Sequence, residues 1–173
     1  MKVAKAKGKV TDLEERAENE ITLNGTIGIG HTRWATHGVP NDVNSHPHMS
    51  NNGRIVLVHN GIIENYEAIK KLLSDKGYIF HSDTDTEVLV NFIQLFQEEQ
   101  NLNLTDAVRV ALNEVVGAYA IAVLDKEEKD TIVVGRLGSP LAIGIGEDEF
   151  FVASDASPFI EFTKDAIYLE DGD

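Results

Sequence analysis

The order of the apolar segments limits what this chain can fold into. Three amphipathic segments lie in the middle of the chain, and its last third is a series of short apolar runs joined by polar turns. We expect strands at 118–124, 131–136, 141–145, 149–153 and 166–169. The turns between them, such as DKEEKD and GED, are short and favour antiparallel hairpins. The pattern predicts a layered α+β domain rather than a doubly wound parallel sheet.

Helical periodicity predicts that the three segments before these strands are helices. Their expected bounds are 62–76, 85–99 and 104–115. Gly77 is placed to end the first of them as its C′ residue. Thr84 followed by Glu87 has the spacing of a capping box at the start of the second.

The first third of the chain is less regular. We expect a short strand at 2–5, a polar helix at 11–19, a strand at 26–30, a long loop at 37–53 and a buried strand at 54–58. Thr11 and Glu14 have the spacing of a capping box for the polar helix. Near the other end of the chain, Ser157-Pro158 is typical of the start of a short helix.

Composition excludes several classes of function. The 173 residues are 42% apolar, which suffices for one core, and no repeat or flexible linker divides them. The formal charge of −14 disfavours a nucleic-acid or anionic-membrane partner. There is no cysteine, so these residues supply no disulfide, thiolate metal site or thiol nucleophile. No apolar run approaches the roughly 18 residues of a membrane span, and we expect a cytoplasmic protein.

Two motifs that resemble ligand sites have simpler interpretations. The glycines of 25–30 and 144–146 do not open a helix and lack the GK[ST] of a phosphate-binding loop, so we interpret them as strand glycines. His46-Pro47-His48 lacks a usual zinc spacing, and a loop histidine that shapes a pocket is the better interpretation. We therefore expect neither a metal nor another cofactor.

Polar residues at three places could take part in a functional site, and some of them also have a simpler structural interpretation. Arg33-Trp34 offers a forked guanidinium for a carboxylate, although such a pair is more often a surface stack. Asn60 and Gly61 follow the buried strand, and a side-chain amide beside a glycine N–H has the composition of an oxyanion hole. Asp85, at the expected start of a helix, suits the positive end of the helix dipole and is also placed to hold an ammonium group.

Taken together, these segments resemble a known family. The motifs are GHTRWATHG at 30–38, NSHPH at 44–48, VHNGIIENY at 58–66, SDTDTEV at 82–88 and ASD at 153–155. Their order and spacing are similar to those in the glutaminase domains of class-II glutamine amidotransferases, in particular of the glutamine–fructose-6-phosphate aminotransferases (glucosamine-6-phosphate synthases). The resemblance covers essentially the whole chain.

The resemblance implies an amino-terminal-nucleophile (Ntn) hydrolase fold, a four-layer αββα sandwich with antiparallel sheets. It implies hydrolysis of L-glutamine to glutamate and ammonia without a metal or other cofactor. In that family the ammonia passes to a separate C-terminal isomerase domain, which makes glucosamine 6-phosphate from fructose 6-phosphate. The expected partners are therefore L-glutamine or L-glutamate and the isomerase domain, with no nucleic acid and no membrane.

The resemblance also implies roles for individual residues. Arg33 would bind the glutamine α-carboxylate and Asp85 its α-ammonium group. The side-chain amide of Asn60 and the backbone N–H of Gly61 would form the oxyanion hole. The remaining pocket residues would be Trp34, Thr36 and His37 in a lid loop, and His46, which would shape the pocket.

The chain departs from the family pattern at its beginning. Members of the family carry a nucleophilic cysteine at the mature N-terminus, with its own α-amine as general base, whereas this chain begins Met1-Lys2-Val3. We therefore expect a single domain, 1–173, truncated at the N-terminus, without its first strand or strands and without the isomerase domain, and inactive for want of the cysteine. The alternatives are a non-catalytic glutamine- or glutamate-binding module, or a folding fragment that forms a homodimer through an exposed sheet edge.

Overall fold

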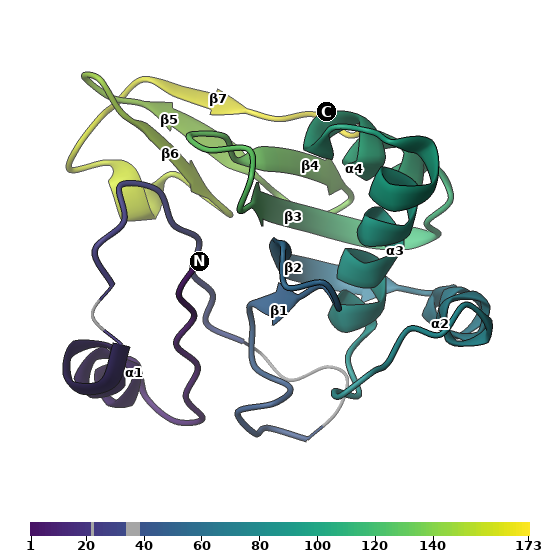
Figure 1. The fold of residues 1–173 in the computed structure, drawn as a ribbon. Helices are drawn as coiled ribbons and strands as arrows, with labels where there is room; N and C mark the ends of the chain where they lie inside the picture. Colours follow the sequence, from purple (N-terminus) through teal and green to yellow (C-terminus); the bar gives the residue numbers. More distant parts are fainter. Residues whose placement is uncertain (22, 34–38) are drawn as a thin grey trace.

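Two antiparallel sheets and a layer of helices make up the fold in the computed structural model (Figure 1). The structure describes residues 1–21, 23–33 and 39–173. The larger sheet has the strand order β1 (His48–Met49), β2 (Ile55–Ile63), β3 (Gly117–Asp125) and β4 (Val133–Leu137). The smaller sheet has the order β6 (Phe150–Ala153), β5 (Ala142–Ile145) and β7 (Ala166–Tyr168). Neighbouring strands in both sheets are antiparallel, which confirms the predicted α+β class.

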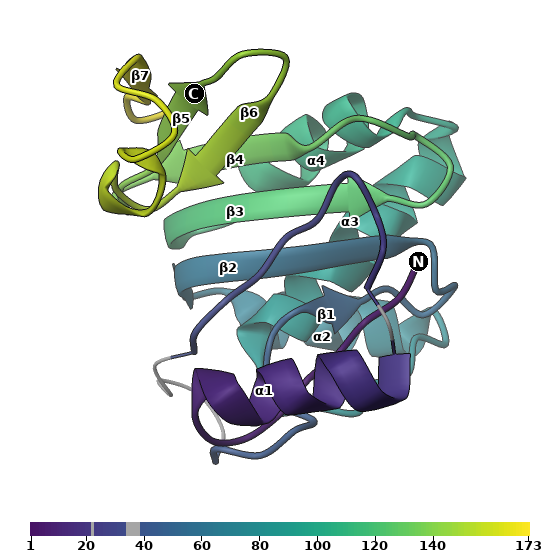
Figure 2. The same cartoon turned by 90° about the vertical axis from the view of Figure 1, so that its left-hand side faces the viewer.

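Three helices cover one face of the larger sheet (Figures 1 and 2). They are α2 (Tyr66–Asp75), α3 (Asp85–Gln100) and α4 (Leu104–Asn113). The central helix, α3, packs on β2 and against both other helices, and most of its residues are buried. Because every second side chain of a strand points to the same face, Ile55, Leu57 and Ile63 of β2 enter the core beneath α3.

The same alternation separates the polar residues near the end of β2. His59 belongs to the helix face, where its Nδ1 atom lies 3.2 Å from the Thr86 hydroxyl of α3. Asn60 belongs to the opposite face, where the segment 23–33 crosses the sheet (Figure 2). Neighbouring residues of one strand therefore serve two different layers.

The first part of the chain lies on the face of the larger sheet opposite α2–α4 (Figure 2). It contains α1 (Val10–Arg16) and a π-helical turn, η1 (Ala17–Ile21). None of the residues of α1 is buried, as expected for a polar helix. Its N-cap is Lys9, whose N–H donates to the Asp12 carboxylate (2.7 Å), so the capping box predicted at Thr11 and Glu14 is wrong.

Two predicted strands are also wrong, because residues 2–5 and 26–30 form no regular strand. The long loop expected at 37–53 contains the two-residue strand β1. The smaller sheet and β3 and β4 agree with the predicted strands to within about two residues, which is the usual uncertainty of an element boundary.

The boundary between β2 and α2 differs most from the prediction. The strand continues to Ile63, so Asn60 and Gly61 lie within it rather than after it, and α2 begins at Tyr66 rather than at residue 62. The cause is tertiary, because Ile62 and Ile63 pair with Ala118 and Gly117 of β3. A ladder with a neighbouring strand overrides the helical spacing of these apolar residues.

The capping box predicted at Thr84 forms in one direction only. The Thr84 hydroxyl accepts a hydrogen bond from the Glu87 N–H (3.2 Å) at the start of α3, whereas the Glu87 carboxylate accepts from the N–H groups of His81 and Ser82 and not from that of Thr84. The other two helix signals agree with the structure. Gly77 follows the C-cap of α2 with a φ of +91°. Ser157-Pro158 begins the 3₁₀ turn η2 (Ser157–Phe159). Within the described part of the chain, no helix combines the length and apolar character needed to cross a membrane.

Candidate functional site

A pocket of about 300 Å³ lies where the end of β2, the start of α3 and the segment around residue 33 meet. Its lining includes His31, Arg33, His46, Asn60, Gly61 and Asp85. The structure therefore brings together five residues that the sequence singled out, from four separate segments. Trp34, Thr36 and His37, which complete the predicted set, lie outside the described residues.

Asn60 and Gly61 form one wall of the pocket. Asn60 is solvent-exposed, and its Oδ1 accepts a hydrogen bond from His31 Nε2 (2.7 Å). Gly61 has a φ of +132°, and a Cβ atom at this position would overlap the Ala118 carbonyl oxygen of β3. Only glycine fits here, because it alone tolerates this φ and this close approach of the neighbouring strand.

Asp85, the first residue of α3, also lines the pocket. Its side chain is 7% exposed, and its Oδ2 accepts a hydrogen bond from the Ile63 N–H (2.8 Å). The Thr86 hydroxyl lies 3.5 Å from Asp85 Oδ1 as a second donor. A carboxylate has about four acceptor sites, so Asp85 keeps the capacity to bind a further donor. The carboxylate also lies at the positive end of the helix dipole, which stabilises its negative charge.

The loop before α3 is held by a second buried carboxylate. Glu87 accepts hydrogen bonds from the N–H groups of His81 (3.0 Å) and Ser82 (2.7 Å), and from the Ser82 hydroxyl (2.7 Å). A carboxylate that accepts several donors in this way rigidifies the turn that it spans. The sequence predicted that Glu87 helps to start the helix, and the structure shows that it also fixes the loop leading to Asp85.

Three histidines, His31, His46 and His59, line the pocket. The rings of His31 and His46 stack, with centroids 4.2 Å apart and planes 18° apart, and His46 also meets the edge of His48 at 5.1 Å. The His59 N–H donates to His46 Nδ1 (3.2 Å). Because Nδ1 accepts this bond, the proton of the neutral His46 ring is on Nε2.

Burial keeps these rings neutral. It lowers the pKa of His46 to about 2, with a further contribution from the positive charge of His31 and His48 if they are protonated. Burial likewise lowers the pKa of His48 to about 3, with help from the nearby Lys5 ammonium group. Among residues 1–21, 23–33 and 39–173, no group of three or more His, Asp or Glu is placed to hold a metal ion. The described rings of the cluster stack on one another and take part in hydrogen bonds with Asn60 and the His59 N–H.

Sequence reasoning missed two members of the site, His31 and His59. A signal for His31 was present, since it stands two residues before Arg33 and residues so spaced share a side of an extended segment. His59 had no such signal, because its partners His46, Thr86 and Asp85 are at least 13 residues away.

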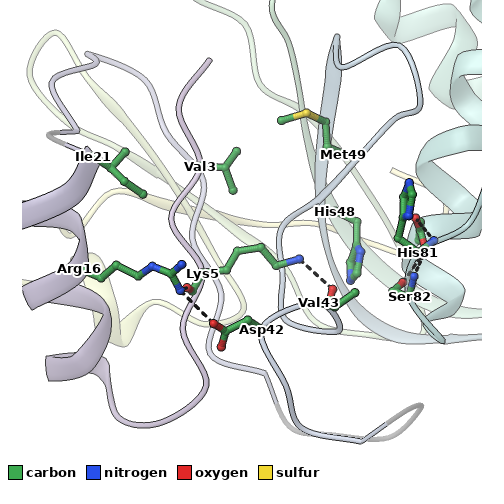
Figure 3. Close-up of a pocket in the computed structure, with 11 residues that line it drawn as sticks. Val3, Lys5, Arg16, Ile21, Asp42, Val43, His48, Met49, His81 and Ser82 are labelled. Atoms are coloured by element: carbon green, nitrogen blue, oxygen red, sulfur yellow. Dashed lines mark hydrogen bonds and ion pairs between the residues drawn. The ribbon is translucent and has the colours of Figure 1, made fainter.

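Two further cavities share residues with the site. One of about 310 Å³ is lined in part by His31, Arg33 and His46. Another of about 640 Å³ lies between the two sheets and shares His31 and Asn60 with the site. A separate cavity of about 370 Å³ lies beyond His48 (Figure 3). There Lys5 Nζ donates to the Val43 carbonyl (3.0 Å), and Arg16 pairs with Asp42 (3.0 Å). Both charged side chains bind groups of the protein itself. We therefore interpret this cavity as a gap in the packing between the N-terminal segment and the loop before β1.

Comparison with protein families and with curated proteins gives matches over nearly the whole chain. Residues 5–170 match the family model described as glutamine amidotransferase domain. The chain is 54% identical over 173 residues to glutamine–fructose-6-phosphate aminotransferase [isomerizing] of Bacteroides thetaiotaomicron, covering 100% of this chain and 28% of that protein. It is 53% identical over 176 residues to the protein of the same name from Chlorobaculum tepidum, covering 100% and 29%. The chain thus spans less than a third of the length of these curated relatives.

Solved structures are similar in fold. The glutamine phosphoribosylpyrophosphate amidotransferase of B. subtilis superposes with a TM-score of 0.62 at 32% identity, covering 80% of this chain and 29% of that one. A structure described as the allosteric regulatory enzyme of purine biosynthesis gives a TM-score of 0.75 at 31% identity, covering 94% and 34%. These likenesses confirm the predicted Ntn-hydrolase type of fold, with antiparallel sheets and helices.

Proposed function

This chain belongs to the glutamine amidotransferase family, and from that premise we propose that its pocket binds L-glutamine for hydrolysis of the side-chain amide to glutamate and ammonia. The observation that carries the proposal is the convergence of Arg33, Asn60, Gly61 and Asp85 on one pocket of about 300 Å³. That volume is at the lower end of the range for small-molecule sites, which suits an amino acid.

The two charged residues match the two ends of an amino-acid backbone. A guanidinium binds a carboxylate through two parallel N–H···O bonds, so Arg33 takes the α-carboxylate. The Asp85 carboxylate accepts from the α-ammonium group, and its bond from Ile63 N–H holds it in place. The pair favours a free amino acid, because such a ligand carries a group of opposite charge for each of the two residues.

Asn60 and Gly61 are then placed for the other end of glutamine. Attack on the side-chain amide gives a tetrahedral intermediate with a negative oxygen, which hydrogen-bond donors must stabilise. The Asn60 Nδ2–H and the Gly61 N–H are the donors in this proposal. Loss of one such donor reduces kcat by about 10²–10³ in enzymes of this kind. Trp34, Thr36 and His37 are proposed as lid residues over the substrate, and His46 as a residue that shapes the pocket.

The relatives suggest the use made of the ammonia. They carry the name glutamine–fructose-6-phosphate aminotransferase [isomerizing]. We infer that residues 1–173 act as one glutaminase domain, whose ammonia serves the conversion of fructose 6-phosphate to glucosamine 6-phosphate on an isomerase domain.

The 173 residues contain no cysteine, so the chain by itself is proposed to bind glutamine without hydrolysing it. The family chemistry uses a thiol nucleophile, which these 173 residues do not supply. A binding module that never turns glutamine over is the second candidate, and the missing thiol is the observation that favours it.

Calorimetric titration with L-glutamine and L-glutamate tests the binding site. Arg33→Met is expected to weaken binding by roughly tenfold or more, since a hydrogen bond to a charged group contributes about 1.5–3 kcal/mol. Arg109→Met is the matched control, because Arg109 is 73% exposed and pairs only across one turn of α4 with Asp106. Equal affinity in both variants would remove Arg33 from the site.

An ammonia-release assay on the same samples separates binding from catalysis. The unaltered chain is expected to release no ammonia above background. If the unaltered chain released ammonia and Asn60→Ala abolished that release, a nucleophile other than cysteine would be acting. This result would contradict the proposal that the chain by itself does not hydrolyse glutamine.

A further inference from the structure

His31 and Asn60 share a hydrogen bond that determines which end of the Asn60 amide faces the pocket. His31 Nε2 lies 2.7 Å from Asn60 Oδ1. An amide oxygen only accepts, so the proton of this bond is on His31 Nε2. With its oxygen engaged in this way, the Asn60 side chain keeps both N–H bonds for other acceptors.

The shape of the Asn60 side chain does not determine which way its amide is oriented. The oxygen and the NH₂ group of an amide are nearly equal in size, so packing alone does not distinguish the two orientations, and the hydrogen-bond partners decide. The reversed amide would turn its carbonyl oxygen toward a negative oxygen in the pocket and repel it. The partner of Oδ1 therefore controls whether Asn60 is a donor where the proposed chemistry needs one.

His31 is itself fixed from the backbone of β2. Its ring stacks on His46 at 4.2 Å, and His46 Nδ1 accepts the His59 N–H. The other ring nitrogen of His31, Nδ1, is buried and has no hydrogen-bond partner among the described residues. Burial lowers the pKa of His31, and the interactions of its ring with the Asn60 side chain and the His59 backbone offset only part of that shift, so the ring stays neutral.

We propose that His31 is a positioning residue, which holds the Asn60 amide with its Nδ2–H bonds toward the pocket as oxyanion donors. The inference deepens the proposed function and rests on it for the nature of the ligand. His31 does not touch the substrate in this proposal, and it acts only through Asn60.

Two substitutions separate the hydrogen bond from the ring stack. His31→Phe keeps an aromatic face for His46 and removes the donor. His31→Gln keeps an N–H donor at a similar distance from the backbone and removes the ring. A positioning role requires that Gln rescues what Phe loses, whereas a purely structural role for the stacked ring requires the reverse.

The ligand for the test is L-2-amino-4-phosphonobutanoate, a glutamate analogue whose phosphonate presents tetrahedral anionic oxygens where glutamine has its amide. Calorimetry gives its affinity, and ¹H–¹⁵N spectra follow the Asn60 side-chain amide during the titration. We expect roughly tenfold or weaker binding for His31→Phe, close to the loss of a hydrogen bond to a charged group, and near-native binding for His31→Gln. The Asn60 amide signals should shift with ligand in the native chain and in His31→Gln only.

Different results would contradict the role of His31 and the proposed function. Native affinity in His31→Phe, or an equal loss in both variants, overturns the positioning role. Absence of binding to the native chain overturns the proposed ligand, and the ligand-free protein then still decides the inference. Long-range ¹H–¹⁵N spectra must show His31 protonated on Nε2 and not on Nδ1, and the Nδ1–H tautomer would exclude the hydrogen bond to Asn60.

Discussion

The carboxylate of Asp85 accepts a hydrogen bond from the backbone N–H of Ile63, with Oδ2 and N 2.8 Å apart. This bond joins the first residue of α3 to the last residue of β2, the strand that carries Asn60 and Gly61. The proposed ammonium-binding group and the proposed oxyanion donors therefore move as one unit. A loop between them would leave their separation free to vary, whereas a direct bond fixes it.

Replacing Asp85 separates its structural task from its charge. In Asp85→Asn the amide oxygen still accepts from Ile63, so we expect a stability loss of only about 0.3–1 kcal/mol, from the missing charge at the helix N-terminus. Affinity for glutamine should fall roughly tenfold or more, because the α-ammonium loses its carboxylate. Asp85→Ala should cost about 1–3 kcal/mol more in stability, since the Ile63 N–H is left without a partner. Urea unfolding and calorimetry measure the two effects, and native affinity in Asp85→Asn would contradict the assignment.

Three glycines test the backbone requirement at the site. Gly28→Ala is expected to change stability by less than about 0.5 kcal/mol, because its Cβ meets no atom within 4 Å. Gly77→Ala also has open space but a φ of +91°, which costs about 1–2 kcal/mol. Gly61→Ala combines a φ of +132° with an overlap on the Ala118 carbonyl, and should cost about 3 kcal/mol or more. Urea midpoints should follow this order, and a Gly61→Ala as stable as Gly77→Ala would show that β3 yields without penalty.

Much of the fold follows from signals within a few residues. The cap at Thr84 and the stop at Gly77 involve groups one to three residues apart, and they were predicted from spacing alone. The boundary at Ile62 was missed, because an apolar residue there satisfies both strand and helix periodicity. Only the pairing with Ala118 of β3, 56 residues along the chain, decides between them.

The site shows the same division between local and distant contacts. Arg33, Asn60 and Asp85 carry chemistry that residue type and motif reveal, so they were named from the sequence. The bonds from His31 to Asn60 and from His59 to His46 span 29 and 13 residues, and their existence depends on how β2 meets the segment crossing it. No local pattern contains that information.

The buried histidines should make stability depend on pH. The folded pKa values of His46 and His48, about 2 and 3, lie below the unfolded value near 6.5. The unfolded chain therefore binds protons that the folded chain does not, so stability is full above about pH 6.5 and falls as the pH drops. Near pH 5.5 each histidine contributes a slope approaching about 1.4 kcal/mol per pH unit.

Urea unfolding between pH 5 and 7 measures that slope. Gln does not titrate, so His46→Gln should lower the number of protons taken up on unfolding by nearly one. The slope of stability against pH should decrease accordingly. His81→Gln serves as control, since His81 is exposed and only its backbone N–H is used in the loop. An unchanged slope in His46→Gln would mean that His46 is protonated in the folded chain.

Arg54 should matter more for stability than any exposed ion pair, because it neutralises a buried carboxylate. The Asp125 side chain is fully buried and receives Arg54 Nε at 2.7 Å and Nη2 at 2.7 Å, together with Gln97 Nε2 at 2.8 Å. Burial alone would raise the pKa of Asp125, but these bonds outweigh it and lower that pKa.

Arg54→Met is expected to cost about 3–5 kcal/mol, because it leaves the charge buried and unpaired. The double variant with Asp125→Asn should recover part of that loss, whereas Arg109→Met on the surface of α4 should cost no more than about 0.5 kcal/mol. Urea unfolding of the four chains tests the pair, and equal losses for Arg54→Met and Arg109→Met would show that water reaches Asp125 once Arg54 is gone.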